Sequence, residues 1–459
     1  MSDFYNINGC MLDKYQIKAI ESENDYTLLV AGAGSGKTLT ILGKIKYLKE
    51  VKHYKDKEIL VISFTNETVN SLKNKINNMG YNIDVKTFHK LAMSLITNKY
   101  KLLNYDLLDY VIDEYFKSII YYDKKLRRLL KNYFYYDGNI DKLYNSYEYN
   151  MLKKTISTFI HLLKGKGENI NNIYEYYKKS IFNERIILKY IMDIYLIYTR
   201  ELESTNTYDF DDLLIKATEY VNKNIKYKYI IIDEFQDTSL VRFKLIKKII
   251  DCTGSKLFVV GDDYQSIYRF SGCNLDLFIN FTKYFNKGKI YYLKYTYRNS
   301  NQLIHVSVNF IMKNKKQLRK HIESNKNINK PIKIVFNKSL EEIINIINDK
   351  DILVIGRNNS DIENINYDNK LTIHRSKGLE ANNVILVNSD NIPSKLKNEK
   401  VLRYVLNDKD YIMYEEERRL FYVALTRTKN NIYIMVNKKR SPFIKELLSD
   451  YKNYIEIIS

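Results

Sequence analysis

The chain has 459 residues, of which 45% are apolar, so it is long enough for about three domains with well-formed cores. It contains no run near the ~18 apolar residues of a membrane span, no visible secretory signal, and three cysteines without metal-type spacing. We therefore expect a reduced, cytoplasmic protein without a membrane partner. The formal charge of +20 mildly favours a polyanionic partner such as nucleic acid, although the surplus of Lys, Asn, Ile and Tyr is also typical of an AT-rich genome.

Residues 12–98 alternate apolar strand patterns with helical patterns, which predicts a parallel, doubly wound sheet. An apolar run at 26–30 precedes the sequence Ala-Gly-Ala-Gly-Ser-Gly-Lys-Thr at 31–38. A glycine-rich turn between a strand and a helix is typical of a phosphate-binding loop. The residues expected to bind the phosphates of ATP are Ala33, Gly34, Ser35, Gly36, Lys37 and Thr38. Lys37 is expected at the β- and γ-phosphates, and Thr38 is expected to ligate Mg²⁺.

The pattern changes in residues 101–207, where apolar residues and tyrosines recur at helical spacing with Lys and Glu between them. This periodicity predicts a helical insertion. We expect its many tyrosines mainly in cores and on helix surfaces rather than as platforms for stacking bases.

A strand pattern at 230–232 ends in two adjacent carboxylates, Asp233 and Glu234. We expect Asp233 to hold Mg²⁺ and Glu234 to orient the attacking water, as phosphoryl transfer from ATP requires. The transition state also needs positive charge at the γ-phosphate. Arg298 and Arg427 are candidates for that charge, and a surface salt bridge is the alternative for each of them.

A second α/β unit is expected in the C-terminal part of the chain, because strand patterns return there. The expected strands are at 290–293, 332–336, 352–355, 384–387 and 432–436. We find no internal repeat and no long low-complexity tail in the sequence, so both α/β units are expected to be integral domains.

Segments spread over nearly the whole chain resemble the motifs of the UvrD/Rep-type DNA helicases of superfamily 1, in the order of that family. They are residues 12–16, 31–38, 63–66, 87–89, 209–213, 233–237, 260–272, 296–298, 372–380 and 416–427. The details are most similar to the DNA helicase IV group. The resemblance implies an α/β fold with two RecA-like P-loop NTPase domains, each built on a parallel sheet, and one helical insertion subdomain in the first.

The resemblance also implies roles around the nucleotide. Gln16 would read adenine through its amide, and Tyr297 would stack on the base. Gln265 would sense the γ-phosphate and link hydrolysis to motion, while Glu380 would contact the ribose or the attacking water. Arg298 and Arg427 would act as arginine fingers from the second domain. The nucleotide would then lie between the two α/β units.

The resemblance further implies a path for single-stranded DNA, which needs aromatic faces for the bases and a basic groove for the backbone. The residues at the matching positions are Phe64, Thr65, Thr87, Phe88, His89, Tyr268, Phe270 and His374. Core packing is a serious alternative for Phe64 and Phe88, whereas stacking is favoured for Tyr268 and Phe270. Most relatives carry tryptophan at the position of Phe270. The helicase IV group shares the phenylalanine.

The family's domain plan implies a division of this chain. Residues 1–100 with 208–287 would form domain 1A, 101–207 the helical subdomain 1B, and 288–459 domain 2A. The short gap between Arg298 and Thr372 leaves no room for the family's 2B subdomain, and we also expect the N-terminal extension of helicase IV to be missing.

The leading hypothesis is an ATP-dependent translocase or helicase on single-stranded DNA and on its junctions with duplex, with Mg²⁺ as cofactor, 3′→5′ polarity and a role in DNA repair or processing. A second is the motor or sensor subunit of an antiphage defence complex with a separate nuclease as partner. A third is an ATP-gated clamp on single-stranded DNA with little turnover, which the full set of catalytic residues disfavours. An RNA motor is a fourth, and contacts to the 2′-OH would distinguish it.

Overall fold

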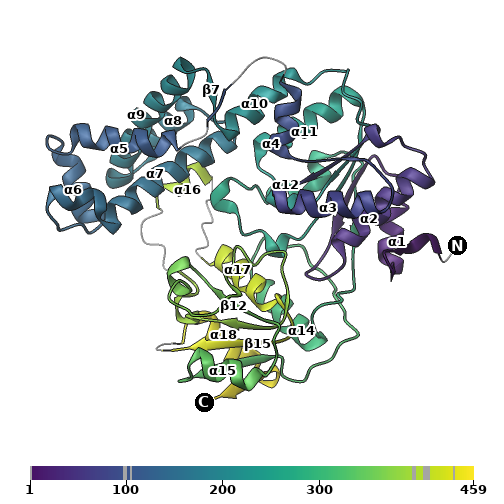
Figure 1. Cartoon of the computed structure of the whole chain (residues 1–459). Coiled ribbons are helices and arrows are strands. Elements are labelled where there is room, and N and C mark those ends of the chain that lie inside the picture. Colours follow the sequence, from purple (N-terminus) through teal and green to yellow (C-terminus); the bar gives the residue numbers. More distant parts are fainter. Residues whose placement is uncertain (1–2, 97–100, 104–105, 395–399, 407–413, 438–439) are drawn as a thin grey trace.

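The computed structural model describes residues 3–96, 101–103, 106–394, 400–406, 414–437 and 440–459. They form two units built on large sheets and one helical arm (Figure 1). In this view the first unit lies at upper right, the arm at upper left and the second unit below both. Each large sheet has six strands, and the pairings within both sheets are parallel. The predicted α/β class with two parallel sheets is therefore confirmed.

The first large sheet has the strand order β10-β3-β9-β8-β4-β5. Its strands are β3 (Tyr26–Val30), β4 (Ile59–Ser63), β5 (Asp84–Thr87), β8 (Tyr229–Ile232), β9 (Lys256–Gly261) and β10 (Lys289–Tyr292). Side chains alternate across the sheet, so Leu28 and Val30 enter one hydrophobic cluster while Leu29 enters the other. Both faces are apolar because helices cover both.

The helices that cover the first sheet divide between these two clusters. On the Leu29 side lie α1 (Lys14–Ile20), α2 (Lys37–Glu50) and α3 (Asn66–Asn78); on the other side lie α4 (Phe88–Leu95), α10 (Phe210–Tyr220) and α11 (Leu240–Thr253). This layering leaves the carboxyl ends of the strands as the edge where ligands bind in parallel α/β sheets.

One strand assignment from the sequence is wrong. The strand expected at 290–293 in the second unit is β10, and it pairs in parallel with β3 of the first sheet. Its apolar side chains, those of Ile290, Tyr291 and Tyr292, are at least partly exposed to solvent. This exposure is expected for a strand at the edge of a sheet. Because β10 directly precedes the connection to the second unit, its sequence pattern does not show which sheet it joins.

The second large sheet has the strand order β13-β12-β14-β15-β11-β16. Its strands are β11 (Ile332–Phe336), β12 (Ile352–Gly356), β13 (Lys370–Thr372), β14 (Ala381–Leu386), β15 (Thr428–Val436) and β16 (Ile455–Ile458). On one face pack α14 (Asn301–Ile311), α17 (Glu415–Leu425) and α18 (Pro442–Asp450), and on the other packs α15 (Leu340–Ile347). The sequence predicted the central strands, whereas the short edge strands β13 and β16 were missed.

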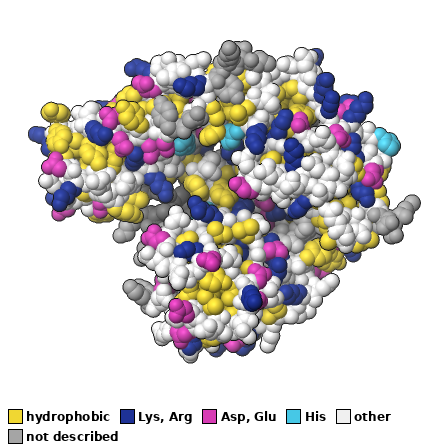
Figure 2. All heavy atoms as spheres, viewed as in Figure 1, with side chains coloured by type: hydrophobic (Ala, Val, Ile, Leu, Met, Phe, Trp, Pro, Cys, Tyr) yellow, Lys and Arg dark blue, Asp and Glu magenta, His cyan; other side chains and the backbone are white. Residues whose placement is uncertain are grey.

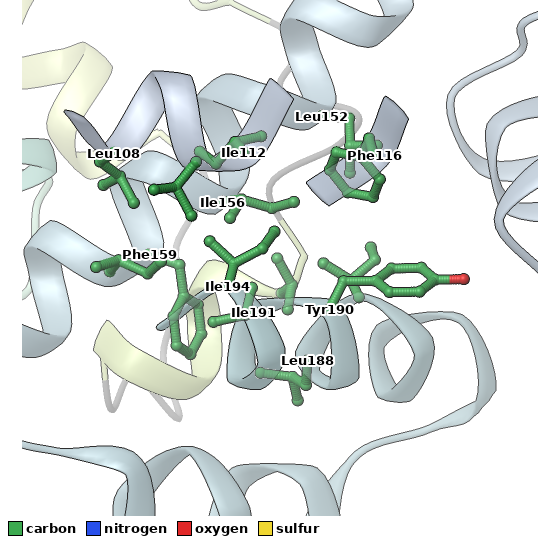
Figure 3. Close-up of a cluster of buried hydrophobic side chains, with 14 of the residues drawn as sticks. Leu108, Ile112, Phe116, Leu152, Ile156, Phe159, Leu188, Tyr190, Ile191 and Ile194 are labelled. Carbon is green, nitrogen blue, oxygen red and sulfur yellow. The ribbon is translucent and has the colours of Figure 1, made fainter. Parts of the chain in front are cut away.

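The helical arm has its own hydrophobic core, part of which Figure 3 shows. Its helices are α5 (Leu107–Ile119), α6 (Lys124–Tyr133), α7 (Tyr147–Gly165), α8 (Ile170–Lys179) and α9 (Phe182–Ser204). Buried tyrosines pack in this core with their hydroxyls on carboxylates: Tyr149 donates to Asp113 at 2.6 Å and Tyr190 to Asp123 at 2.9 Å. In the part of the chain that the structure describes, none of the helices is both long and apolar enough to span a bilayer.

A short helix from the second unit's part of the chain completes the core of the arm. Helix α16 (Leu402–Leu406) lies beside α7 (Figure 1). Val401, Leu402 and Val405 are buried in the same cluster as the arm's own helices. The sequence does not indicate this contact, because five helical residues give no recognisable period.

Candidate functional site

The glycine-rich loop runs from the carboxyl end of β3 to the start of α2. Gly34 and Gly36 have left-handed φ values of 70° and 78°, and a Cβ atom on Gly36 would lie 2.5 Å from Gln16 Nε2. A Cβ atom on Gly34 would collide with Cβ of Arg298. Helix α2 has no side-chain N-cap, so its first N–H groups are available to an anion.

The acidic pair lies opposite this loop at the end of β8. Lys37 Nζ is 3.2 Å from Glu234 Oε1, and the Glu234 N–H donates to Asp233 Oδ1 at 2.9 Å. Burial and repulsion from Glu234 raise the pKa of Asp233. Glu234 is only partly buried, and Lys37 and Lys377 outweigh the desolvation of its carboxylate and lower its pKa. The pair is thus a concentrated negative charge that attracts cations.

Both candidate arginines extend from the second unit to this edge of the first sheet. Arg298 donates from Nε to Glu380 Oε2 at 2.6 Å, so the surface salt bridge named as its alternative is present, although the Arg298 side chain itself is largely buried. Arg427 is 1% exposed, so it does not form a surface salt bridge. Burial and the neighbouring Arg298 lower the pKa of Arg427, and a bound anion would offset this.

Gln265 connects the two units directly. Its Nε2 donates to Asp262 Oδ2 at 2.6 Å, and its Oε1 accepts from the guanidinium of Arg427 at 3.1 Å. Arg427 also donates from Nε to the carbonyl of Val423 at 3.0 Å. The side chain of Gln265 therefore contacts both units.

The residues expected at the base and ribose lie beside the loop. Gln16 is fully buried; its Oε1 accepts from the Asp13 N–H at 2.9 Å and its Nε2 donates to the Ser35 carbonyl at 3.3 Å. Each end of its amide thus makes one hydrogen bond within the protein, and its reading of adenine stays a prediction. Tyr297 is 61% exposed and donates from its hydroxyl to Asp13 Oδ2 at 2.8 Å, which leaves a ring face open to a base.

An aromatic cluster joins the two units on the side of the predicted strand path. The ring centroids of Phe270 and His374 are 5.6 Å apart, and those of Tyr268 and Phe270 are 6.1 Å apart. Tyr268 donates from its hydroxyl to the His374 carbonyl at 3.0 Å. Phe270 is 52% exposed, so its ring is available for stacking. Burial, with Arg357 nearby, lowers the pKa of His374 to about 4, which keeps the imidazole neutral at pH 7.

The remaining strand-path residues are less exposed. Phe88 is buried in the core, as its structural alternative predicted, and Phe64 packs against it at 5.7 Å with Arg242 over the Phe64 ring. His89 lies against Phe210 at 4.8 Å. Thr65 and Thr87 cap α3 and α4, accepting through their Oγ1 atoms from the N–H groups of Thr68 and Lys90 respectively. The surface is hollowed where the arm and the two units meet (Figure 2), and basic and histidine side chains lie around the hollow.

Comparison with known proteins identifies the family. The profile of the UvrD/REP helicase N-terminal domain matches residues 12–286. The chain belongs to the UvrD/Rep helicase family. The profile of the UvrD-like helicase C-terminal domain matches residues 356–439, which include Glu380 and Arg427, whereas Tyr297 and Arg298 lie between the two matched ranges.

Three helicases are 26–29% identical to this chain over the aligned residues. The chain is 27% identical to DNA helicase IV of Escherichia coli over 97% of its own length and 71% of that protein. It is 29% identical to ATP-dependent DNA helicase Rep of Buchnera aphidicola over 73% of its length and 48% of Rep, and 26% identical to ATP-dependent DNA helicase PcrA of Bacillus subtilis over 68% and 41%. The chain thus spans about half the length of Rep and PcrA.

Three residues at this UvrD/Rep-type site were missed by the sequence analysis. Phe210 is 54% exposed beside His89, and Lys377 forms an ion pair with Asp237 and lies 3.9 Å from Glu234. Phe210 lies in the motif at 209–213 and Lys377 in the motif at 372–380. Their aromatic and basic side chains could therefore have indicated a place in the site. Lys320 is buried against Asp262 and Asp263, and nothing in the polar stretch around it indicates this.

Proposed function

We propose that this UvrD/Rep family member is an ATP-dependent motor that moves 3′→5′ along single-stranded DNA, acting in the cytoplasm in DNA repair or processing. The contact of Arg427 with Gln265 is the observation that carries the proposal. Through this contact, side chains of both units would adjoin the γ-phosphate of ATP. Hydrolysis between the units would then change how the units pack against each other.

ATP and Mg²⁺ suit the residues present. The left-handed glycines leave a cradle that a Cβ atom would fill, and Lys37 pairs there with Glu234, a partner that phosphate oxygens would replace. Thr38 and Asp233 would hold the cation, with Ala33, Ser35 and Gly36 lining the phosphates. The cation would neutralise charge on the phosphate oxygens. Glu234 would orient the attacking water, and Arg298 and Arg427 would stabilise the charge that develops.

Single-stranded DNA would cross both units on the aromatic side. Tyr268, Phe270 and His374 bring rings from the two units within about 6 Å of each other, and base stacking on such platforms stabilises binding by about 1–3 kcal/mol per base. Phe64, His89 and Phe210 would continue the path over the first unit. The charge of +20 supports attraction of the phosphate backbone.

The domain plan that we propose follows the sheets. The first unit would be 1A (1–100 and 208–292, extended from 287 to include β10), the arm 1B (101–207) and the second unit 2A (293–459). Between Ile311 and Ile332 the structure describes a connection without helix or strand, where a 2B subdomain would otherwise be inserted. A motor of this plan would translocate but open duplex poorly, and a partner such as a nuclease would complete its activity.

ATP hydrolysis by the purified protein tests the proposal, measured alone and with single-stranded DNA, single-stranded RNA or duplex DNA. We expect strong stimulation by single-stranded DNA only. Stimulation by RNA to the same degree would favour an RNA motor instead. No stimulation by any nucleic acid, with ATP bound, would contradict the motor and favour an ATP-gated clamp.

A further inference from the structure

Lys320 lies in the connection between α14 and β11, yet it is among the most buried charged residues of the chain. Its side chain is 2% exposed. The connection passes beneath the glycine-rich loop, where a Cβ atom on Gly32 would lie 2.6 Å from Cδ1 of Ile322. A lysine buried this deeply in a segment without helix or strand requires fixed partners.

The ammonium group of Lys320 is held by two carboxylates. It pairs with Asp262 and lies 2.7 Å from Asp263 Oδ1, while the ring of Tyr264 lies under it with the centroid at 3.8 Å. It also donates to the Ala31 carbonyl at the start of the phosphate loop, at 3.4 Å. Lys320 therefore joins the phosphate loop to the segment after β9.

Asp262 passes this contact on to Gln265. Its Oδ1 faces Lys320 and accepts from the Tyr264 N–H at 3.1 Å, which fixes the plane of the carboxylate. Its Oδ2 then accepts from Gln265 Nε2 at 2.6 Å. The amide of Gln265 is thereby oriented so that its oxygen faces Arg427.

The same connection is tied to α17, the helix that ends two residues before Arg427. Gln317 donates from Nε2 to Asp263 Oδ2 at 2.7 Å and accepts at Oε1 from Arg419 at 3.1 Å. Arg419 belongs to α17 and also donates to the Ser266 carbonyl at 2.8 Å. Both ends of the Gln265–Arg427 contact are therefore connected to the segment 317–320.

We propose that Lys320 is a positioning residue for the γ-phosphate step: through Asp262 it sets the orientation of Gln265, and through the segment 317–320 it couples that orientation to α17. The proposal rests on the ATPase function proposed above. Lys320 does not touch the nucleotide in this account. It acts on the rate of hydrolysis and on the response to DNA, and leaves nucleotide binding to the phosphate loop.

The variant Lys320→Met tests the proposal because it removes the charge and keeps the side-chain volume. We expect the affinity for a fluorescent ATP analogue to stay within about threefold of wild type, and kcat with saturating single-stranded DNA to fall about 10- to 100-fold, as misplaced catalytic groups do. We expect the double variant with Gln265→Ala to be no slower than Gln265→Ala alone, since both act on one step.

Lys313→Met is the matched control, because Lys313 lies in the same connection between two carboxylates, Glu446 and Asp450, but is 41% exposed. We expect wild-type kcat from it. The proposal would be overturned if kcat of the double variant fell by the product of the two single-variant losses. It would also be overturned if Lys320→Met weakened nucleotide binding as much as it lowered kcat. If wild type itself shows no stimulated ATPase, the proposed function fails, whatever Lys320 does.

Gln317→Ala decides the matter if Lys320→Met does not fold, since Asp263 keeps its ion pair with Lys320 and Arg419 keeps its hydrogen bond to the Ser266 carbonyl. It cuts the link between Asp263 and Arg419. We expect a folded protein whose stimulated kcat is about threefold to tenfold lower, with unchanged nucleotide affinity. Wild-type kcat for this variant would refute the coupling through 317–320.

Discussion

At the scale of single residues, the backbone of Glu234 shows how the site is arranged. Its φ of 50° is left-handed, which costs a residue with a side chain about 1–2 kcal/mol. This conformation turns the carboxylate back towards Lys37 immediately after β8. Strain of this kind persists where the surrounding structure fixes it, commonly at functional sites.

Replacing Glu234 by Gln keeps the shape of the side chain and removes its negative charge. We expect ATP hydrolysis to fall by about 100-fold or more, because the attacking water loses its orienting base, while ATP and single-stranded DNA still bind. Steady-state turnover and equilibrium binding separate the two effects. A turnover rate near that of wild type would remove Glu234 from its proposed role.

Replacing Lys37 by Ala removes the charge expected at the β- and γ-phosphates. We predict loss of ATP hydrolysis by about 100-fold or more together with weaker nucleotide binding. Lys49→Ala is the control, because Lys49 lies on the same helix and pairs with Asp56. Equal hydrolysis by the two variants would contradict the assignment of the loop.

Phe270→Ala tests the stacking platform. Since the ring is half exposed and packs edge-on against Tyr268 and His374, we expect DNA-stimulated hydrolysis to fall at least about fivefold, from the loss of about 1–3 kcal/mol of stacking, while basal hydrolysis changes little. Phe182→Ala, an exposed phenylalanine on the arm, serves as control. Equal losses in basal and stimulated rates would indicate that Phe270 supports the local structure and does not stack on DNA bases.

At the scale of elements, the predictable parts are those whose signal is local. The strand, glycine turn and helix at 26–38 are contiguous in the sequence, as are β8 and its carboxylates, so periodicity and turn chemistry indicated both. β10 and α16 were not predictable in this way. Their positions depend on pairing with β3 and on packing against α7, which are contacts with residues far away in the chain.

The packing of α16 predicts a stability effect in the arm. Leu402 is 5% exposed within the arm's core, so Leu402→Ala should lower the free energy of unfolding by about 2–4 kcal/mol. Leu196→Ala, at a 38% exposed leucine of α9, should change it by less than about 1 kcal/mol. Urea denaturation followed by circular dichroism measures both. Equal stability of the two variants would show that α16 contributes nothing to the arm.

At the scale of the whole molecule, the second unit contacts the first at the carboxyl edge of the first sheet. The buried Arg427 reaches Gln265 on the nucleotide side, and the Tyr268–His374 hydrogen bond joins the two units on the strand side. In the proposed motor, hydrolysis and strand binding would act on the same interface, which is the physical requirement for converting hydrolysis into movement along the strand.

Movement along single-stranded DNA tests this account most directly. Streptavidin displacement is measured from oligonucleotides that carry biotin at the 5′ or the 3′ end, with the wild type and with Glu234→Gln. We predict ATP-dependent displacement from the 5′ end by the wild type alone, as a 3′→5′ motor requires. DNA-stimulated hydrolysis without displacement from either end would contradict the account.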